Sequence, residues 1–188
     1  MQESLVTKEY KPEDILHAVH YNKGILWDKI TAFRKQISVL EGAATHEVGK
    51  PQEELMQKHY PLKHHMKGGL YTREIFMPKG HLIVSFIHKQ HHPSFLLQGK
   101  VSFLNDEGKV ITIEAPHTVF TQIGTQRIFY VHEDTKWVCV YKTDAKTVEE
   151  AEKEIYAVSY KELPKKVINK FLKKNFTILL ITKYQIVN

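Results

Sequence analysis

A change of hydrophobic period at Leu70 is the feature that most constrains how this chain can fold. From there to Lys142, short apolar runs follow one another with turn residues between them and no helical pattern. Short strands at close, even spacing are typical of an antiparallel sandwich or barrel. The sequence therefore predicts a mainly β domain, with strands over 70–77, 81–88, 95–97, 100–104, 110–114, 119–122, 127–132 and 136–141.

Both flanks of this β region are expected to be helical. An apolar face over about 24–40 is formed by residues three and four apart: Trp27, Ile30, Phe33, Ile37 and Leu40. Pro51 and Pro164 each precede a further short helix, and Asp144 or Thr147 could cap a glutamate-rich one. We therefore divide the chain into a helical extension over 1–69, the β domain over 70–142 and a basic helical extension over 143–188, where 176–187 could form a closing strand.

Composition narrows the class of protein. The chain has 188 residues, a formal net charge of +6 and a single cysteine, Cys139, so it cannot form an internal disulfide. It begins without the basic start and apolar run of a signal peptide, and we expect a cytoplasmic protein without a membrane partner. The lysine-rich helix after Pro164 has few aromatic residues, which favours a solvated basic face over a nucleic-acid-binding surface.

Histidines are the residues with the clearest chemical potential. The chain has 12, and those that gather before the middle of the sequence are His59, His64, His65, His81, His88, His91 and His92. Imidazole is the commonest metal ligand in proteins and titrates near neutral pH. Because successive residues of a strand point to opposite faces, His91 and His92 are not expected to share one site.

The segment from Gly80 to Gly99 resembles the first motif of the cupin family, G-x5-H-x-H-x3-E-x6-G. The two glycines and the second histidine, His88, stand at their expected places. Phe86 replaces the first histidine, and His92 replaces the glutamate. The resemblance covers about 70–142 and implies a cupin-type antiparallel β-barrel, a double-stranded β-helix, with helical N- and C-terminal extensions.

The second cupin motif, G-x5-P-x-G-x2-H-x3-N, is degenerate. Residues 122–124 can stand for its turn, which puts Arg127 at the last histidine and Val131 at the asparagine. The phrases at 69–75, 87–93, 124–127 and 132–137 also resemble cupin-like proteins encoded by tailed bacteriophages. That resemblance implies a protein acting in the host cell cytoplasm.

The resemblance implies a divalent metal held by three histidines and a carboxylate, and the substitutions leave this open. A metal could persist on His88 and His92 if another ligand completes the site, the candidates being His132, His117, His81 or water. Arginine stays protonated and cannot ligate a metal, so Arg127 argues against this arrangement.

Two metal-free interpretations also remain. In one, Arg127 binds a carboxylate or phosphate, His88 and His92 donate hydrogen bonds, and Arg73 and Lys89 add positive charge. In the other, the histidines are structural and Arg127 pairs with an acid, the candidates being Glu74, Glu114 and Glu133.

The leading functional hypothesis is a binding protein for a small anionic ligand, either nucleotide-like or a carboxylate. In a phage it could be an accessory protein that counters host defence. The alternatives are a metal-dependent isomerase, oxygenase or hydrolase, and a structural or interaction protein with an empty barrel. Cupins commonly pair through their sheets, and the Trp27 helix offers an apolar face, so we expect a homodimer or larger homo-oligomer.

Overall fold

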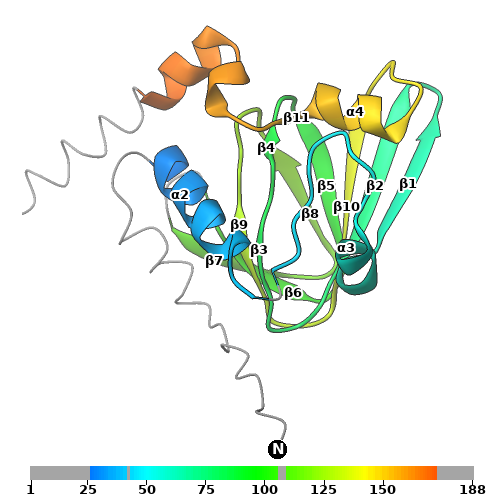
Figure 1. Ribbon diagram of the computed structural model, residues 1–188, viewed down its shortest axis with the longest axis vertical. Coiled ribbons are helices and arrows are strands. Elements are labelled where there is room, and N and C mark those ends of the chain that lie inside the picture. Colours follow the sequence, from blue (N-terminus) through cyan, green and yellow to red (C-terminus); the bar gives the residue numbers. More distant parts are fainter. Residues whose placement is uncertain (1–25, 42, 106–108, 173–188) are drawn as a thin grey trace, which may run out of the picture.

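Two large antiparallel sheets and one small two-stranded sheet form the fold, in a computed structural model that describes residues 26–41, 43–105 and 109–172 (Figure 1). One sheet has five strands, in the order β1 (Leu62–Lys67), β2 (Leu70–Met77), β10 (Thr135–Lys142), β5 (His92–Gln98) and β8 (His117–Thr121). The other large sheet has four, in the order β3 (Leu82–Val84), β9 (Ile128–Val131), β6 (Lys100–Leu104) and β7 (Val110–Glu114).

The strand pairing follows a nested order. β2 pairs with β10, β3 with β9, β5 with β8 and β6 with β7, so the first barrel strand meets the last and the pairing continues inward. The β10–β5 and β6–β9 pairs then join these nested strand pairs into the two large sheets. This arrangement is a jelly roll, or double-stranded β-helix, and it confirms the predicted antiparallel barrel with helical flanks.

Gly99 makes the turn between β5 and β6 possible. Its φ angle is +86°, in the left-handed region that glycine adopts without steric cost. A Cβ at this position would lie 2.5 Å from the Asp134 carbonyl oxygen. The turn at Gly99 and the turn before β10 can therefore approach each other closely only because residue 99 has no side chain.

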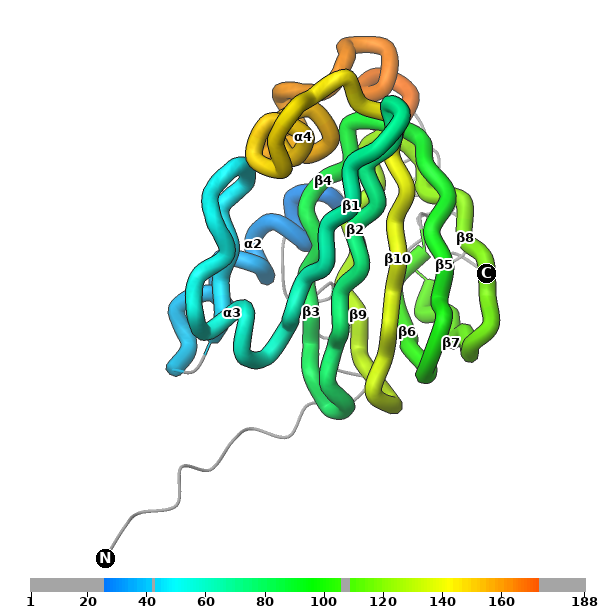
Figure 2. The backbone as a smooth tube through the Cα atoms, turned by 90° about the vertical axis from the view of Figure 1, so that its right-hand side faces the viewer, coloured from blue at the N-terminus to red at the C-terminus, as the bar shows by residue number. Residues whose placement is uncertain are grey.

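Helices cover the outer face of the four-stranded sheet and one end of the barrel (Figures 1 and 2). α2 (Leu26–Ser38) packs through Ile30 on that sheet, where Leu104 and Ile128 lie beneath it. α4 (Val148–Ile155) begins at Thr147, whose side chain accepts a hydrogen bond from the Glu150 amide, and it lies across the barrel end. α3 (Glu54–His59) precedes β1. Within the described residues, we find no helix with the length and apolar character needed to cross a bilayer.

The Trp27 side chain joins the two ends of the described chain. Its ring stacks between Tyr160, at a centroid distance of 3.9 Å, and Phe171, at 3.6 Å, in a cluster with Ile87 and Leu163. Only 4% of Trp27 is exposed. Trp27, one residue of the apolar face from which we expected a contact between protomers, is therefore buried within the chain, and the expected homo-oligomer stays a prediction.

Replacing Trp27 with alanine is expected to cost about 3–5 kcal/mol of stability, because it removes a buried aromatic ring together with both stacking contacts. Urea unfolding followed by circular dichroism measures the change. Val39→Ala is the matched control: Val39 is 82% exposed, and its replacement should change stability by less than about 0.5 kcal/mol. A Trp27→Ala variant as stable as this control would contradict the role of the cluster.

Two segments differ from the sequence predictions, and a third prediction lies outside the described residues. The strand expected over 81–88 is split into β3 and the short β4 (Ile87–His88), which pairs with β11 (Tyr156–Ala157) after α4. β1 was not predicted, and it extends the five-stranded sheet from within the region assigned to the N-terminal extension. The closing strand expected over 176–187 lies outside the described residues, whereas 165–172 are helical as expected.

Candidate functional site

The barrel interior is divided into an apolar half and a polar half. Inward positions of β2 run from Tyr71 and Arg73 to Ile75 and Met77, and those of β10 run in the opposite direction from Trp137 to Cys139 and Tyr141. The register places Trp137 opposite Ile75 and Tyr141 opposite Tyr71, so like residues meet across the strands. We call the half beneath α4 the polar end; its inward side chains are Tyr71, Arg73, His88, His92, Arg127 and Tyr141.

His88 and His92 lie together in the polar end. Their ring centroids are 4.6 Å apart, and Tyr141 lies beside both, 4.2 Å from the His92 ring and with its hydroxyl 3.3 Å from His88 Nδ1. His91 points the other way: its Nδ1 accepts a hydrogen bond from the Ile123 amide outside the barrel. The alternation expected for these neighbours is therefore present.

Both buried imidazoles are held in the neutral form. Burial lowers the pKa of His88 well below 6.5, and the nearby His92, Arg127 and Arg73 lower it further. Burial lowers the pKa of His92 to about 4, although its hydrogen bond to the Gln90 carbonyl acts in the opposite direction. The Nδ1–H of His92 donates that bond, at 3.3 Å, so Nε2 carries the lone pair. This buried Nε2 has no hydrogen-bond partner among the described residues.

Arg127 reaches the same region from the start of β9. Its Nη1 donates a hydrogen bond of 3.1 Å to Thr121 Oγ1, and Thr121 is the register partner of His92. The Arg127 backbone N–H donates to Ser85 Oγ at 2.9 Å, and the guanidinium carbon lies 5.2 Å from the Phe103 ring centroid. The side chain is 7% exposed, so these contacts fix a cation inside the barrel.

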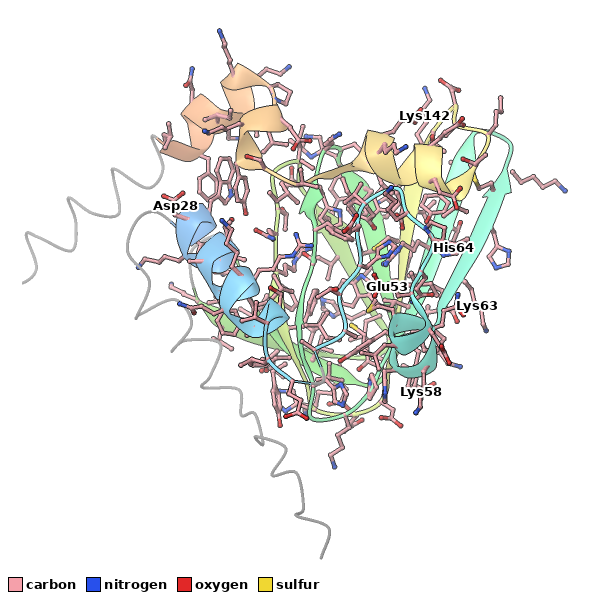
Figure 3. The ribbon with its side chains drawn as sticks, in the orientation of Figure 1. Asp28, Glu53, Lys58, Lys63, His64 and Lys142 are labelled. Atoms are coloured by element: carbon pink, nitrogen blue, oxygen red, sulfur yellow. The ribbon has the colours of Figure 1, made fainter. Side chains whose placement is uncertain are left out.

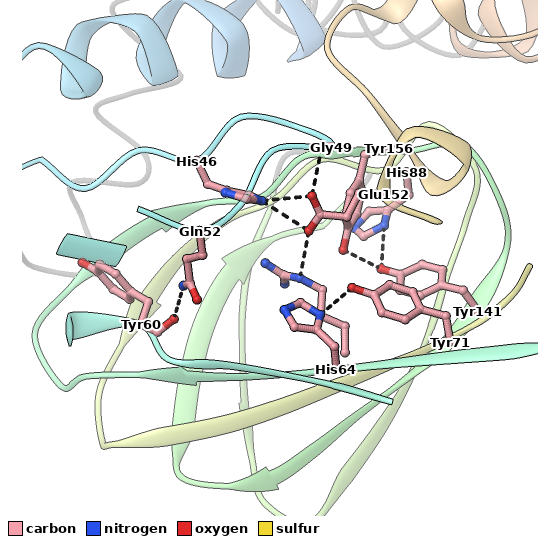
Figure 4. Close-up of polar contacts among 11 residues, drawn as sticks. His46, Gly49, Gln52, Tyr60, His64, Tyr71, His88, Tyr141, Glu152 and Tyr156 are labelled. Carbon is pink, nitrogen blue, oxygen red and sulfur yellow. Dashed lines mark hydrogen bonds and ion pairs between the residues drawn. The ribbon is translucent and has the colours of Figure 1, made fainter. Parts of the chain in front are cut away.

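Glu152 on α4 closes the polar end with a buried carboxylate. His46 Nε2 lies 3.0 and 3.2 Å from its two oxygens, the Gly49 amide donates to it at 3.1 Å, and Arg73 Nε lies 4.0 Å away (Figure 4). Burial acts to raise the pKa of Glu152, but the hydrogen bonds from His46 and Gly49 and the charge of Arg73 outweigh it, so the pKa is lowered. Glu152 is therefore an anion, and His46 Nε2 donates to it.

Tyrosines connect this carboxylate to the histidine pair. The Tyr141 hydroxyl lies 3.1 Å from that of Tyr156, and the Arg73 guanidinium carbon lies 5.9 Å from the Tyr156 ring centroid. On the other side, the Tyr71 hydroxyl lies 2.7 Å from His64 Nδ1. Burial raises the pKa of both Tyr71 and Tyr156, in the second case to about 12, so these hydroxyls stay protonated and act as hydrogen-bonding groups.

Two pockets open at different sides of this network. One, of about 490 Å³, is lined by residues before β1, on β1 and at the start of α4: His46, Lys50, Pro51, Gln52, Gln57, Pro61, Leu62, His64, Val148 and Glu149. We call it the His64 pocket. The other, of about 350 Å³, is lined by Phe103, Asn105, Ile111, Ile113, His117, Thr118, Val119, Phe120 and Arg127. We call it the Arg127 pocket; it lies between β7 and β8, the outer strands of the two sheets.

The structure thus brings four of the predicted site residues, Arg127, His88, His92 and Arg73, into one region. It places His132 elsewhere, because His132 Nε2 lies 2.6 Å from Ser102 Oγ. The register partner of Ser102 is Tyr130, which packs with Ile30 of α2 on the outer face of the four-stranded sheet. Of the other residues considered, His117 lines the Arg127 pocket, whereas His81 and Lys89 make contacts elsewhere. His81 bonds Tyr60, and Lys89 Nζ donates to the Lys153 carbonyl.

The described residues do not fit the metal site that the cupin resemblance implies. Within 26–41, 43–105 and 109–172, no group of three or more histidine, cysteine, aspartate or glutamate side chains is arranged to hold an ion. The two neutral histidines stand beside Arg127 and Arg73, whose charges oppose a divalent cation. Phe86, at the position of the first cupin histidine, packs instead against the rings of His46 and Tyr156.

The sequence did not point to His46, Glu152, Tyr141 and Tyr156. His46 and Glu152 are 106 residues apart, so spacing along the chain gives no sign that they meet. Glu152 was one of four glutamates in the predicted glutamate-rich helix, with Glu149, Glu150 and Glu154. The available signal was the helical period, because Ala151, Glu152 and Ile155 share the buried face of α4.

Comparisons with known proteins return solved structures of low sequence identity to this chain. No family model matches the chain, and no curated protein matches its sequence. Among solved structures, a cupin 2 domain-containing protein from Halorhodospira halophila is similar with a TM-score of 0.41 and 11% identity, over 48% of this chain and 69% of that one. An RmlC-like cupin from Methanocaldococcus jannaschii, described as a double-stranded β-helix, has a TM-score of 0.39 and 8% identity, over 46% and 82%. Similarity at this level says nothing about ligand or activity.

Proposed function

We propose that this protein binds a small organic acid in the Arg127 pocket, with Arg127 holding the carboxylate. The observation that carries the proposal is an arginine, 7% exposed, at the wall of an otherwise largely apolar pocket of about 350 Å³. Pockets of a few hundred Å³ with apolar walls and few, well-placed polar groups are typical of small-molecule sites.

Arg127 is held in position by contacts on several sides. Its Nη1 donates a hydrogen bond to the Thr121 hydroxyl, and its backbone N–H donates one to the Ser85 hydroxyl. Its guanidinium carbon lies over the Phe103 ring. A guanidinium that is already ordered loses little conformational entropy when it binds, and its planar fork matches a carboxylate. These contacts support a preorganised anion-binding group.

The pocket walls indicate what accompanies the carboxylate. Phe103, Ile111, Ile113 and Val119 supply apolar surface, and Arg127 is the single lysine or arginine among the described residues that line the pocket. The phosphates of a nucleotide usually meet several cations or backbone amides. We expected a small anionic ligand that is either nucleotide-like or a carboxylate. The composition of the pocket lining favours the carboxylate, in the form of an aromatic or short aliphatic acid.

The charges in the polar end also favour an anion. Burial lowers the pKa of His88, and the charges of Arg127 and Arg73 lower it further; Arg73 is offset by Glu152 at 4.0 Å, so Arg127 supplies the positive charge available to a ligand. The neutral histidines do not add to that charge but can exchange hydrogen bonds with water or ligand atoms near Arg127. A metal-dependent enzyme has no comparable support from the arrangement of the described side chains.

Benzoate and hexanoate are suitable probes. We expect isothermal titration calorimetry to detect binding of both acids, and much weaker binding of benzyl alcohol, which has the same ring without the charge. Arg127→Met should weaken benzoate binding by about ten- to a hundredfold, the usual effect of losing a hydrogen bond to a charged group.

Arg34→Met is the matched control, because Arg34 also lies over a phenylalanine ring, 4.7 Å from the centroid of Phe86, but does not line the pocket. Circular dichroism at the temperature of the titration confirms that each variant is folded. Equal binding of benzoate and benzyl alcohol, or equal binding by the Arg127→Met and Arg34→Met variants, would contradict the proposal.

A further inference from the structure

The His64 pocket is the larger of the two pockets described, and it lies apart from Arg127. The chain before β1 forms one wall through Pro51 and Gln52, β1 forms another through Leu62 and His64, and α4 contributes Val148. Figure 4 shows His46, Gln52 and His64 on the side of the network away from His88. The pocket therefore lies on a different side of the network from the histidine pair.

Two buried polar atoms without hydrogen-bond partners among the described residues belong to His46, which lines this pocket, and to Arg73, which contacts Glu152. The His46 side chain is 6% exposed; its Nε2 contacts Glu152, but its Nδ1 has no hydrogen-bond partner among the described residues. Arg73 Nε likewise lacks a hydrogen-bond acceptor among them and keeps a contact with Glu152 at 4.0 Å. A buried polar group left unpaired costs free energy, so a group that can both donate and accept is favoured here.

His64 provides a second polar contact at the mouth. It points inward from β1, whereas Lys63 on the same strand extends to solvent with 69% of its side chain exposed (Figure 3). Burial lowers the pKa of His64, and the charge of Arg73 lowers it further. The ring is therefore neutral at neutral pH, with Nδ1 engaged by the Tyr71 hydroxyl, and Nε2 is its remaining polar atom.

The charges around the pocket offset one another. Lys50 and Glu149 are of opposite sign, Gln52 and Gln57 are amides, and the anion Glu152 lies behind the wall. Such a lining offers both donors and acceptors without attracting an anion. Pro51, Pro61, Leu62 and Val148 add apolar surface of the kind that packs against the C–H faces of a sugar ring.

From this lining we infer that the His64 pocket binds a small uncharged polyhydroxylated molecule of the monosaccharide class. Hydroxyl groups both donate and accept, which matches the neutral His64 imidazole, the amides and the Nδ1 of His46, which has no partner among the described residues. The cavity of about 490 Å³ is within the range of small-molecule sites. This site does not depend on the organic-acid site, because none of its lining residues lines the Arg127 pocket.

Ligand-observed saturation-transfer NMR on the full chain tests the inference, with D-ribose, D-glucose and myo-inositol as neutral probes and D-gluconate and glucose 6-phosphate as charged ones. We expect at least one neutral probe to bind at millimolar concentration and the charged compounds to bind no better. His64→Ala should weaken that binding at least about tenfold. His65→Ala is the matched control, because the neighbouring His65 is exposed on the same strand.

Because His64→Ala also removes the partner of Tyr71, a second measurement avoids any variant. Adding the neutral probe to the unmodified protein should shift the side-chain amide resonances of Gln52 and Gln57. Failure of all three neutral probes to bind, tighter binding of the charged compounds, or unchanged Gln52 and Gln57 signals would each overturn the inference. Benzoate binding by the His64→Ala variant, measured in parallel, shows whether the organic-acid site stands or fails independently.

Discussion

Acidification should destabilise this protein strongly through His92. The pKa of His92 is about 4 in the folded protein, against 6.5 for an ordinary histidine, because the ring is buried. Below pH 6.5 the unfolded chain takes up a proton that the folded chain does not, so stability falls as pH falls and levels off below about pH 4. The difference is worth about 3 kcal/mol. His88, with a pKa lowered in the same direction, adds to the loss.

Urea unfolding at neutral pH and near pH 4 measures this effect. In the His92→Gln variant, which cannot titrate at this position, the loss of stability between the two pH values should be smaller by about 3 kcal/mol. His65→Gln serves as the control, because His65 is exposed and its replacement should leave the pH dependence close to that of the unmodified protein. Equal pH dependence in the unmodified protein and in His92→Gln would show that His92 is not held neutral in the barrel.

Removing the Glu152 carboxylate is expected to destabilise the protein strongly. Glu152→Ala leaves Arg73 inside the barrel end without its carboxylate and removes the acceptor for His46 and Gly49. Breaking a buried pair by deleting one partner typically costs about 3–5 kcal/mol, because the other charge remains buried. We therefore expect a loss of that size, or failure to fold.

Chemical unfolding of Glu152→Ala, followed by circular dichroism, measures the loss. Glu149→Ala is the matched control on the same helix, since Glu149 is only partly buried and should tolerate replacement within about 1 kcal/mol. Glu152→Gln should fall between the two, because the amide oxygen keeps an acceptor but loses the charge. A Glu152→Ala variant as stable as Glu149→Ala would mean that the network does not stabilise the barrel end.

Much of the barrel was predictable because its strands carry their own signals. β2, β6 and β7 occupy the predicted ranges, and the turn at Gly99 lies where the spacing of apolar runs placed it. β1 was missed although Leu62, His64 and Met66 do alternate with exposed residues. An inward-facing histidine does not count as apolar, so the alternation was hidden.

The site was less predictable, because it is assembled from distant parts of the chain. The motif spacing placed Arg127, His88 and His92 in one group, since they lie on the barrel itself. The motif carried no information about α4 or the chain around His46, which lie outside it. The Glu152 carboxylate and the His64 pocket follow from tertiary packing between those segments, and a single sequence does not encode that packing in any local pattern.

The most direct test of the organic-acid proposal is a crystal structure of the protein soaked with 4-bromobenzoate. Bromine scatters anomalously, so its position can be located without relying on the shape of the density. The proposal predicts a bromine peak among the apolar side chains between β7 and β8, with the carboxylate within hydrogen-bonding distance of the Arg127 guanidinium. A peak elsewhere, or a carboxylate bound in this pocket away from Arg127, would contradict it.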